Sequence, residues 1–111
     1  MKAIRMTNKV YQEFTPLRES CANNSEDDHW DGLWTAMDNA TPVHKGYRSP
    51  WIAQLTDQQL QRFMHALETQ IEYVLFVQLD QALNDRDRKA ANECHYIARQ
   101  MKQLMANLEV K

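Results

Sequence analysis

Residues 56–85 read TDQQLQRFMHALETQIEYVLFVQLDQALND, and the expected architecture follows largely from them. Thr56 and Gln59 have the spacing of a capping box, in which each side chain satisfies a backbone donor at the start of a helix. Apolar residues then recur at steps of three and four, the spacing of one face of an α-helix. They include Leu60, Phe63, Met64, Leu67, Ile71, Val74, Leu75 and Ala82. A long amphipathic helix is therefore predicted over residues 56–84.

A second apolar stripe follows a charged turn at residues 85–89. It consists of Ala90, Ala91, Cys94, Ile97, Ala98, Met101, Leu104, Met105 and Leu108. Two helices of similar length joined by a short connection favour an antiparallel pair. We therefore expect a long antiparallel helical hairpin, about 56–84 and 86–109, whose small residues near the turn let the two helices approach closely.

The residues that interrupt regular structure are few and lie in one half of the chain. The 111 residues include two glycines and three prolines, and all five lie between residues 16 and 50. Sandwiches and barrels use glycine and proline at most of their turns, so this scarcity favours an all-α fold. We expect a single domain over residues 1–111. Its irregular, aromatic-rich half at 1–50 would supply short N-terminal helices that cover the helical hairpin at 51–111.

Two short helices are expected in the first half. Apolar side chains within residues 6–17 have helical spacing, although Pro16 should break or end a helix there. Asp28 is placed to cap a second helix over residues 30–37, whose apolar face includes two tryptophans. Gly32 lies inside this helix and costs about 1 kcal/mol relative to alanine, so the helix needs tertiary support.

The segment that joins the two halves contains the remaining glycine and two prolines. Residues 41–50, TPVHKGYRSP, are expected to form a loop. Ser49 followed by Pro50 is a common opening for a helix, with proline in the first turn. Residues 51–55 are therefore predicted to form a short helical turn that leads into the long helix.

Residues 73–79, YVLFVQL, are apolar almost all round the predicted helix. A strand is the alternative for this segment, although the helical pattern continues on both sides of it. A helix that is apolar on every side must be covered on every side, which one partner helix cannot do. The cover could come from the N-terminal half or from a second copy, and we predict a homodimer that forms a helical bundle. The residues predicted for its interface are Tyr73, Phe76, Val77, Leu79 and Leu83.

Residues 26–38 carry five acidic side chains and no basic one. They can form a solvated loop whose acids favour a helix N-terminus, or a docking surface for a basic partner with tryptophans as anchors. Mimicry of nucleic acid would need far more acid than a net charge of −2. The tryptophans can equally pack the first half onto the hairpin. The preferred hypothesis is a non-enzymatic protein-binding regulator, adaptor or inhibitor whose acidic, Trp-bearing contact surface lies within residues 26–51. The residues predicted to bind the partner protein are Asp27, Asp28, Trp30, Asp31, Trp34 and Asp38.

Motifs of catalysis and metal binding are missing from the sequence. It contains no CxxC, HxxxH, GxxxxGK[ST], GxGxxG or GxSxG pattern, so neither an enzyme nor a cofactor is expected. The alternative is a metal site at His65, Glu68 and Glu72, or a redox thiol at Cys94. A solvated helix face is the favoured interpretation of the first three residues, and core packing is the favoured interpretation of Cys94.

A second alternative is a nucleic-acid-associated regulator that uses the basic face of the last helix. The basic residues are Arg86, Arg88, Lys89, Arg99 and Lys102. A net charge of −2 argues against a chain whose main role is to coat nucleic acid. The longest apolar run, residues 73–77, is far shorter than the ~20 residues that span a bilayer. We therefore expect no membrane association, a cytoplasmic location, and reduced thiols at Cys21 and Cys94.

Overall fold

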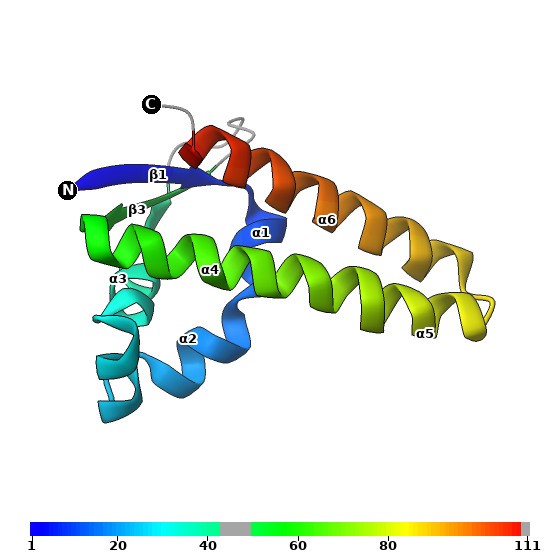
Figure 1. The fold of residues 1–111 in the computed structure, drawn as a ribbon, viewed down its shortest axis with the longest axis horizontal. Coiled ribbons are helices and arrows are strands. Elements are labelled where there is room, and N and C mark those ends of the chain that lie inside the picture. Colours follow the sequence, from blue (N-terminus) through cyan, green and yellow to red (C-terminus); the bar gives the residue numbers. More distant parts are fainter. Residues whose placement is uncertain (43–49, 110–111) are drawn as a thin grey trace. The chain divides into compact units, whose positions relative to one another are not determined.

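The computed structural model describes residues 1–42 and 50–109. The chain divides into two compact units, Met1–Phe63 and Met64–Lys111, and the boundary falls inside helix α4 (Asp57–Tyr73) rather than at residue 50, where the composition changes. The described residues are mostly helical, with one small three-stranded sheet (Figure 1). The all-α class is therefore wrong. Most of the expected loop lies outside the described residues, since they leave out 43–49.

The sheet belongs to the first unit and is antiparallel. Its strands are β1 (Lys2–Met6), β2 (Thr41–Pro42) and β3 (Trp51–Leu55), in the order β1-β3-β2. In β1 the side chains of Ile4 and Met6 are buried, and in β3 those of Ala53 and Leu55 are buried, so both strands show the alternation of a half-buried sheet. The helical turn predicted over residues 51–55 is wrong, because this segment pairs with a strand at the other end of the unit.

Four short helices follow β1 in this unit. They are α1 (Asn8–Glu13), α2 (Thr15–Cys21), the 3₁₀ helix η1 (Ser25–Trp30) and α3 (Leu33–Asp38). The helix expected within residues 6–17 is divided before Pro16, which lies in the first turn of α2. The helix expected over residues 30–37 is also divided. Asp31 and Gly32 have left-handed backbones, with φ of 56° and 77°, and separate η1 from α3.

Aromatic side chains form the centre of the first unit. The ring of Phe14 lies 5.5 Å from that of Trp34 and 5.6 Å from that of Phe63, and all three side chains are fully buried. Tyr11 stacks on Trp51 at a centroid distance of 4.0 Å. Within this unit α3 contacts both α2 and β3, so the core lies between the short helices and the sheet.

The capping box predicted at residues 56–59 is confirmed. The backbone N–H of Thr56 donates to Gln59 Oε1 at 3.0 Å, and the backbone N–H of Gln59 donates to Thr56 Oγ1 at 3.1 Å. From α4 the chain stays helical through the π-helix η2 (Val74–Gln78) and α5 (Leu79–Asn84). The last helix, α6, covers Arg88–Glu109. Both long helical stretches lie within two residues of the ranges expected from the sequence.

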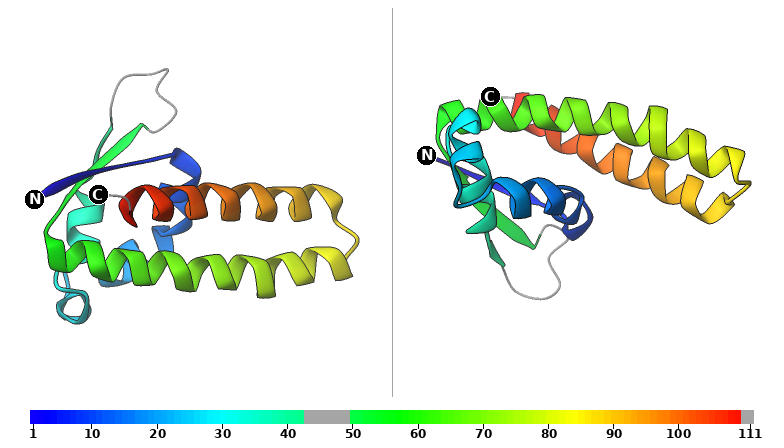
Figure 2. Two further views of the ribbon diagram at one scale, coloured as in Figure 1. Left: turned by 45° about the horizontal axis from the view of Figure 1, so that its top comes forward. Right: turned by 90° about the horizontal axis from the view of Figure 1, so that it is seen from below.

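In the second unit α6 contacts α5 and η2, and Figure 2 shows it running back beside them after the turn. Arg86 has a left-handed backbone at the turn, with φ of 55°. Asp87 caps α6, because its Oδ1 accepts a hydrogen bond of 3.0 Å from the backbone N–H of Ala90. Small side chains are buried on both helices near the turn, including Ala82, Ala91 and Ala98.

Candidate functional site

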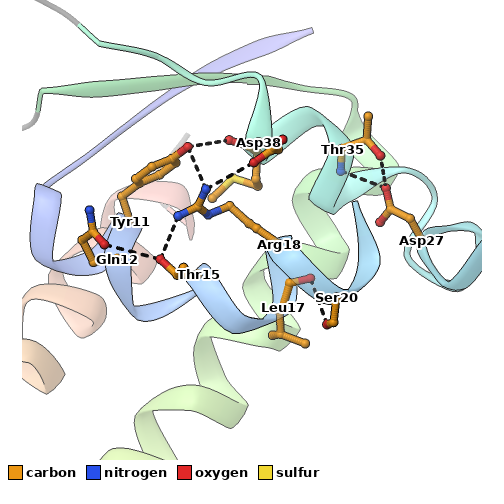
Figure 3. A network of polar contacts seen from close by, with 10 residues as sticks. Tyr11, Gln12, Thr15, Leu17, Arg18, Ser20, Asp27, Thr35 and Asp38 are labelled. Carbon is orange, nitrogen blue, oxygen red and sulfur yellow. Dashed lines mark hydrogen bonds and ion pairs between the residues drawn. The ribbon is translucent and has the colours of Figure 1, made fainter. Parts of the chain in front are cut away.

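The acidic segment predicted to bind a partner is largely used inside the first unit, beginning with Asp27. This side chain is only 3% exposed. Its Oδ1 accepts from the backbone N–H of Trp34 at 2.9 Å. Its Oδ2 accepts from the backbone N–H and the hydroxyl of Thr35 at 2.8 and 2.6 Å (Figure 3). Gly32 stands at the N-cap position of α3 and has no side chain to offer. Asp27 therefore caps α3 from the preceding helix, and the prediction that Asp28 does so is wrong.

Asp38 pairs with a buried arginine that the sequence analysis missed. Arg18 Nη1 donates to Asp38 Oδ1 at 3.4 Å and to the hydroxyl of Tyr11 at 3.1 Å, and Nη2 donates to Thr15 Oγ1 at 2.8 Å (Figure 3). The Tyr11 hydroxyl in turn donates to the carbonyl of Met37 at 3.2 Å. A buried guanidinium needs such partners, because an unpaired buried charge is costly. Asp38 thus helps to join α2 and α3.

Asp31 connects the break between η1 and α3 to the start of α4. Its carboxylate accepts from Arg62 Nε at 3.0 Å, and its backbone carbonyl accepts from Gln59 Nε2 at 3.0 Å. Both members of the ion pair are exposed, so the pair contributes at most about 1 kcal/mol. These contacts hold the left-handed residue in place and occupy its polar groups.

The three tryptophans all lie in the first unit, and each packs against an aromatic ring. Trp34 is 0% exposed, and Trp30 is half-buried with its ring edge-on to that of Trp34 at 5.3 Å. Trp51 stacks on Tyr11 and donates from Nε1 to Asn8 Oδ1 at 2.9 Å. Trp34 therefore does not belong to a contact surface, because exposing it would open the core. Asp28 remains exposed and Trp30 partly so.

The residues predicted for a dimer interface lie instead at the surface of the second unit. Four large apolar side chains on the end of α4, η2 and α5 are exposed, and we call them the apolar stripe: Tyr73, Phe76, Val77 and Leu83. Phe76 is 74% exposed and Leu83 is 59% exposed. The fifth predicted residue, Leu79, is half-buried.

The π-helix η2 lies at the centre of this stripe. A π turn holds more residues than an α turn, and such turns are frequent at functional sites. Val74 at the start of η2 is fully buried, whereas Phe76 and Val77 in the same turn are exposed. The segment is thus apolar on its outer side as well as its inner side, as expected from the sequence.

The two helical stretches of the second unit have opposite charge. Residues 64–84 contain three acids and no lysine or arginine. Two of these acids, Glu72 and Asp80, are exposed and lie about one turn before and after Phe76. The helix α6, Arg88–Glu109, contains four lysines and arginines and two glutamates. The four bases are exposed and form what we call the basic face of α6: Arg88, Lys89, Arg99 and Lys102.

One aromatic side chain interrupts the basic face. Tyr96 is 48% exposed on α6. Lys89 lies two turns before it and Arg99 about one turn after it, which places the three residues on one side of the helix. The second unit therefore presents two amphipathic surfaces. One is the apolar stripe flanked by acids, and the other is Tyr96 between Lys89 and Arg99, with the exposed Glu93 beside it.

The residues considered for metal or redox chemistry are not gathered into a site. Within the described residues no group of three or more His, Cys, Asp or Glu side chains could hold a metal ion. His65, Glu68 and Glu72 are all exposed. Cys94 is buried and lines a cavity of about 350 Å³ beside the turn, whose lining includes three acids and no base. A reactive thiolate is favoured by a cationic neighbour, which this lining does not provide.

The remaining observations concern the cysteines, membrane-spanning helices and similarity to known proteins. Cys21 and Cys94 are both buried, and neither belongs to a disulfide. Across residues 1–42 and 50–109, none of the helices combines the length and the apolar character needed to cross a bilayer. No protein-family model matches the chain, and no curated protein or solved structure is significantly similar to it.

Proposed function

We propose that this protein is a small non-enzymatic protein-binding protein, acting as a regulator, adaptor or inhibitor, and that it contacts its partner through the apolar stripe. The observation that carries the proposal is the 74% exposure of Phe76 beside three other exposed apolar side chains on the same helical stretch. Single exposed apolar residues are ordinary, but a cluster of them rimmed by polar residues is typical of a protein-binding surface. Aromatic side chains are also the residues most often found at the centre of such surfaces.

The remainder of the second unit supports this surface as a scaffold. We propose that α6 and the helical stretch α4-η2-α5 act as an antiparallel hairpin, held at its turn by the cap from Asp87 and by the buried alanines. A surface on regular helices is positioned more rigidly than one on loops. The N-terminal acidic segment offers less support, because Asp27, Asp31 and Asp38 already have partners within the first unit.

Site-specific photo-crosslinking tests the proposal. A photoreactive amino acid is placed at position 76 in the full chain, and the matched control carries it at Gln81, which is exposed and polar on the same helical stretch. We expect a crosslinked protein product from cells at position 76 and little or none at position 81. Replacing Val77 by serine in the position-76 protein should reduce the yield. Equal yields at the two positions, or no product at either, would refute the proposal.

The basic face of α6 supports a second candidate, a nucleic-acid-associated regulator. Four exposed bases around an exposed tyrosine can contact phosphates and stack on a base. The test is fluorescence anisotropy with a labelled single-stranded and a labelled double-stranded oligonucleotide at low salt. Binding that weakens steeply with salt and is lost on Arg99→Glu, but not on Phe76→Ser, would favour this candidate over the first.

A further inference from the structure

We infer that the partner of the apolar stripe is a second copy of this chain, whose α6 presents Tyr96 and the basic face to the stripe. This inference rests on the proposed function, because it names the occupant of the same surface. It is an interaction between two different surfaces, each of which is present on every copy. The two surfaces match in charge, in side chains and in the spacing of their charges.

The two surfaces carry opposite charges. The stripe is flanked by Glu72 and Asp80, and no lysine or arginine occurs in residues 64–84. The surface around Tyr96 carries Lys89 and Arg99 together with one exposed acid, Glu93, so its net charge is positive. Pairing two stripes directly would place acids against acids, and like charges across an interface are unfavourable. Pairing a stripe with α6 of another copy places each acid against a base instead.

The side chains at the two centres also match. Phe76 and Tyr96 are both exposed aromatic residues, and aromatic rings in contact attract each other beyond the effect of burial alone. The long apolar stems of Lys89 and Arg99 can cover Val77 and Tyr73 while their charged ends reach the carboxylates. The contact therefore covers apolar groups and pairs the charges around them.

The spacing of the charges is compatible with simultaneous pairing. At about 1.5 Å per residue, Glu72 and Asp80 are about 12 Å apart along their helix, and Lys89 and Arg99 about 15 Å along theirs. Two long basic side chains can bridge that difference. A two-fold axis would repeat the contact, since each copy then gives its stripe to the other copy and receives the other's stripe on its own α6. We therefore infer a closed dimer with two equivalent contacts.

Charge reversal in the purified full-length protein tests this arrangement. The stripe variant carries Glu72→Lys and Asp80→Lys, and the α6 variant carries Lys89→Glu and Arg99→Glu. Masses are measured by sedimentation equilibrium at tens of micromolar, with circular dichroism to show that the helices are intact. We expect the wild type to have twice the monomer mass of 13.1 kDa. Each variant alone should dissociate at least tenfold more readily, because its two contacts become repulsive.

Mixing the two variants gives the decisive measurement. Lysine at the stripe of one chain then faces glutamate on α6 of the other, and the second contact keeps its native acids and bases, so the mixture should regain the dimer. Glu19→Lys with Asp28→Lys is the matched control, because it changes the net charge equally at exposed positions in the first unit. This control should dimerise like the wild type.

Several results would overturn the inference, and they separate it from the proposed function. A monomeric wild type at tens of micromolar would refute the second copy as occupant. The proposed function would survive that result if crosslinking at position 76 yields a different protein, and would fail with it if no product forms. If the α6 variant alone dimerises like the wild type, α6 is not the counterpart of the stripe. If the mixture stays monomeric although both variants are folded, the pairing of charges is refuted.

Discussion

The cap that Asp27 provides for α3 leads to a prediction about stability. We consider the substitution Asp27→Ala, which removes a carboxylate that accepts three hydrogen bonds from Trp34 and Thr35. Nothing else at the N-terminus of α3 replaces it, because the N-cap residue is Gly32. The substitution therefore removes the side-chain cap and leaves its donors without their acceptor.

The expected cost follows from the surroundings of each donor. Trp34 is fully buried, so its backbone N–H stays without a partner, at about 1–3 kcal/mol. Thr35 is half-buried, and water can replace the carboxylate at its N–H and hydroxyl. Loss of a helix cap by itself costs about 1 kcal/mol. The lost cap and the unpaired Trp34 N–H are the same loss, so we expect Asp27→Ala to lower the free energy of unfolding by about 1–3 kcal/mol. Asp27→Asn keeps one acceptor oxygen and should cost roughly half as much.

Urea denaturation followed by tryptophan fluorescence measures this loss in the correct unit. All three tryptophans lie within Met1–Phe63, so their emission reports the unfolding of the first unit. With a urea slope of about 2 kcal/mol per M, the midpoint should fall by about 0.5–1.5 M. The control is Asp28→Ala, which truncates the exposed neighbour and should change stability by less than about 0.5 kcal/mol. The capping argument would be refuted if Asp27→Ala cost no more than this control.

Two further substitutions test the backbone break and the buried arginine of the first unit. Gly32→Ala places a side chain at a φ of 77° and should cost about 1–2 kcal/mol by the same urea assay, because the added Cβ would make ordinary contacts and only the backbone is strained. A stabilised Gly32→Ala protein would contradict this reasoning. Tyr11→Phe removes the hydroxyl that accepts from Arg18 and donates to the Met37 carbonyl, and should cost about 1–3 kcal/mol while the ring still stacks on Trp51. An unchanged midpoint would show that the Tyr11 hydroxyl contributes nothing measurable.

The helical second half could be predicted from the sequence because its signals are local. The capping box at residues 56–59 and the three- and four-residue spacing each depend on side chains within two turns of one another. The turn could be located in the same way, from the charged residues 85–89. Local signals that repeat over several turns, as these do, depend little on the rest of the chain.

The sheet could not be predicted because its pairing joins distant residues. Ile4 is opposite Ala53 in the register of β1 and β3, and the sequence around either residue does not indicate this pairing. Residues 51–55 are compatible with a helical turn when only Ser49 and Pro50 are considered. Pairing with β1 overrides that preference, because an isolated turn of helix has few hydrogen bonds to set against a strand that is paired along its length.

The roles of the acids in residues 26–38 could not be predicted either, because they also depend on contacts between distant residues. Composition revealed the cluster of acids, but it could not show which acid faces the core. Asp27 and Asp28 are neighbours of the same type, yet one is buried under α3 and the other is exposed. The partner of Asp38 is Arg18, which lies on another helix and has no spacing signal to connect them. A cluster of acids in a sequence is therefore a weak guide to a binding surface, because its members can cap helices or pair with bases within the same fold.

The apolar stripe could be predicted for a different reason. A helix that packs against one other helix can bury only one of its faces. Apolar residues on its other faces must be buried by another part of the chain or by a partner. Residues 73–79 have apolar side chains on more than one face of the helix, and this can be seen from the sequence alone. What the structure adds is which of these side chains are exposed. Val74 faces inward, Phe76 and Val77 face outward, and the acids that flank them differ in sign from the bases around Tyr96. The acids and tryptophans of the first unit mostly contact other residues of that unit. The apolar stripe and Tyr96 of the second unit are exposed instead, and for this reason we propose the interaction there.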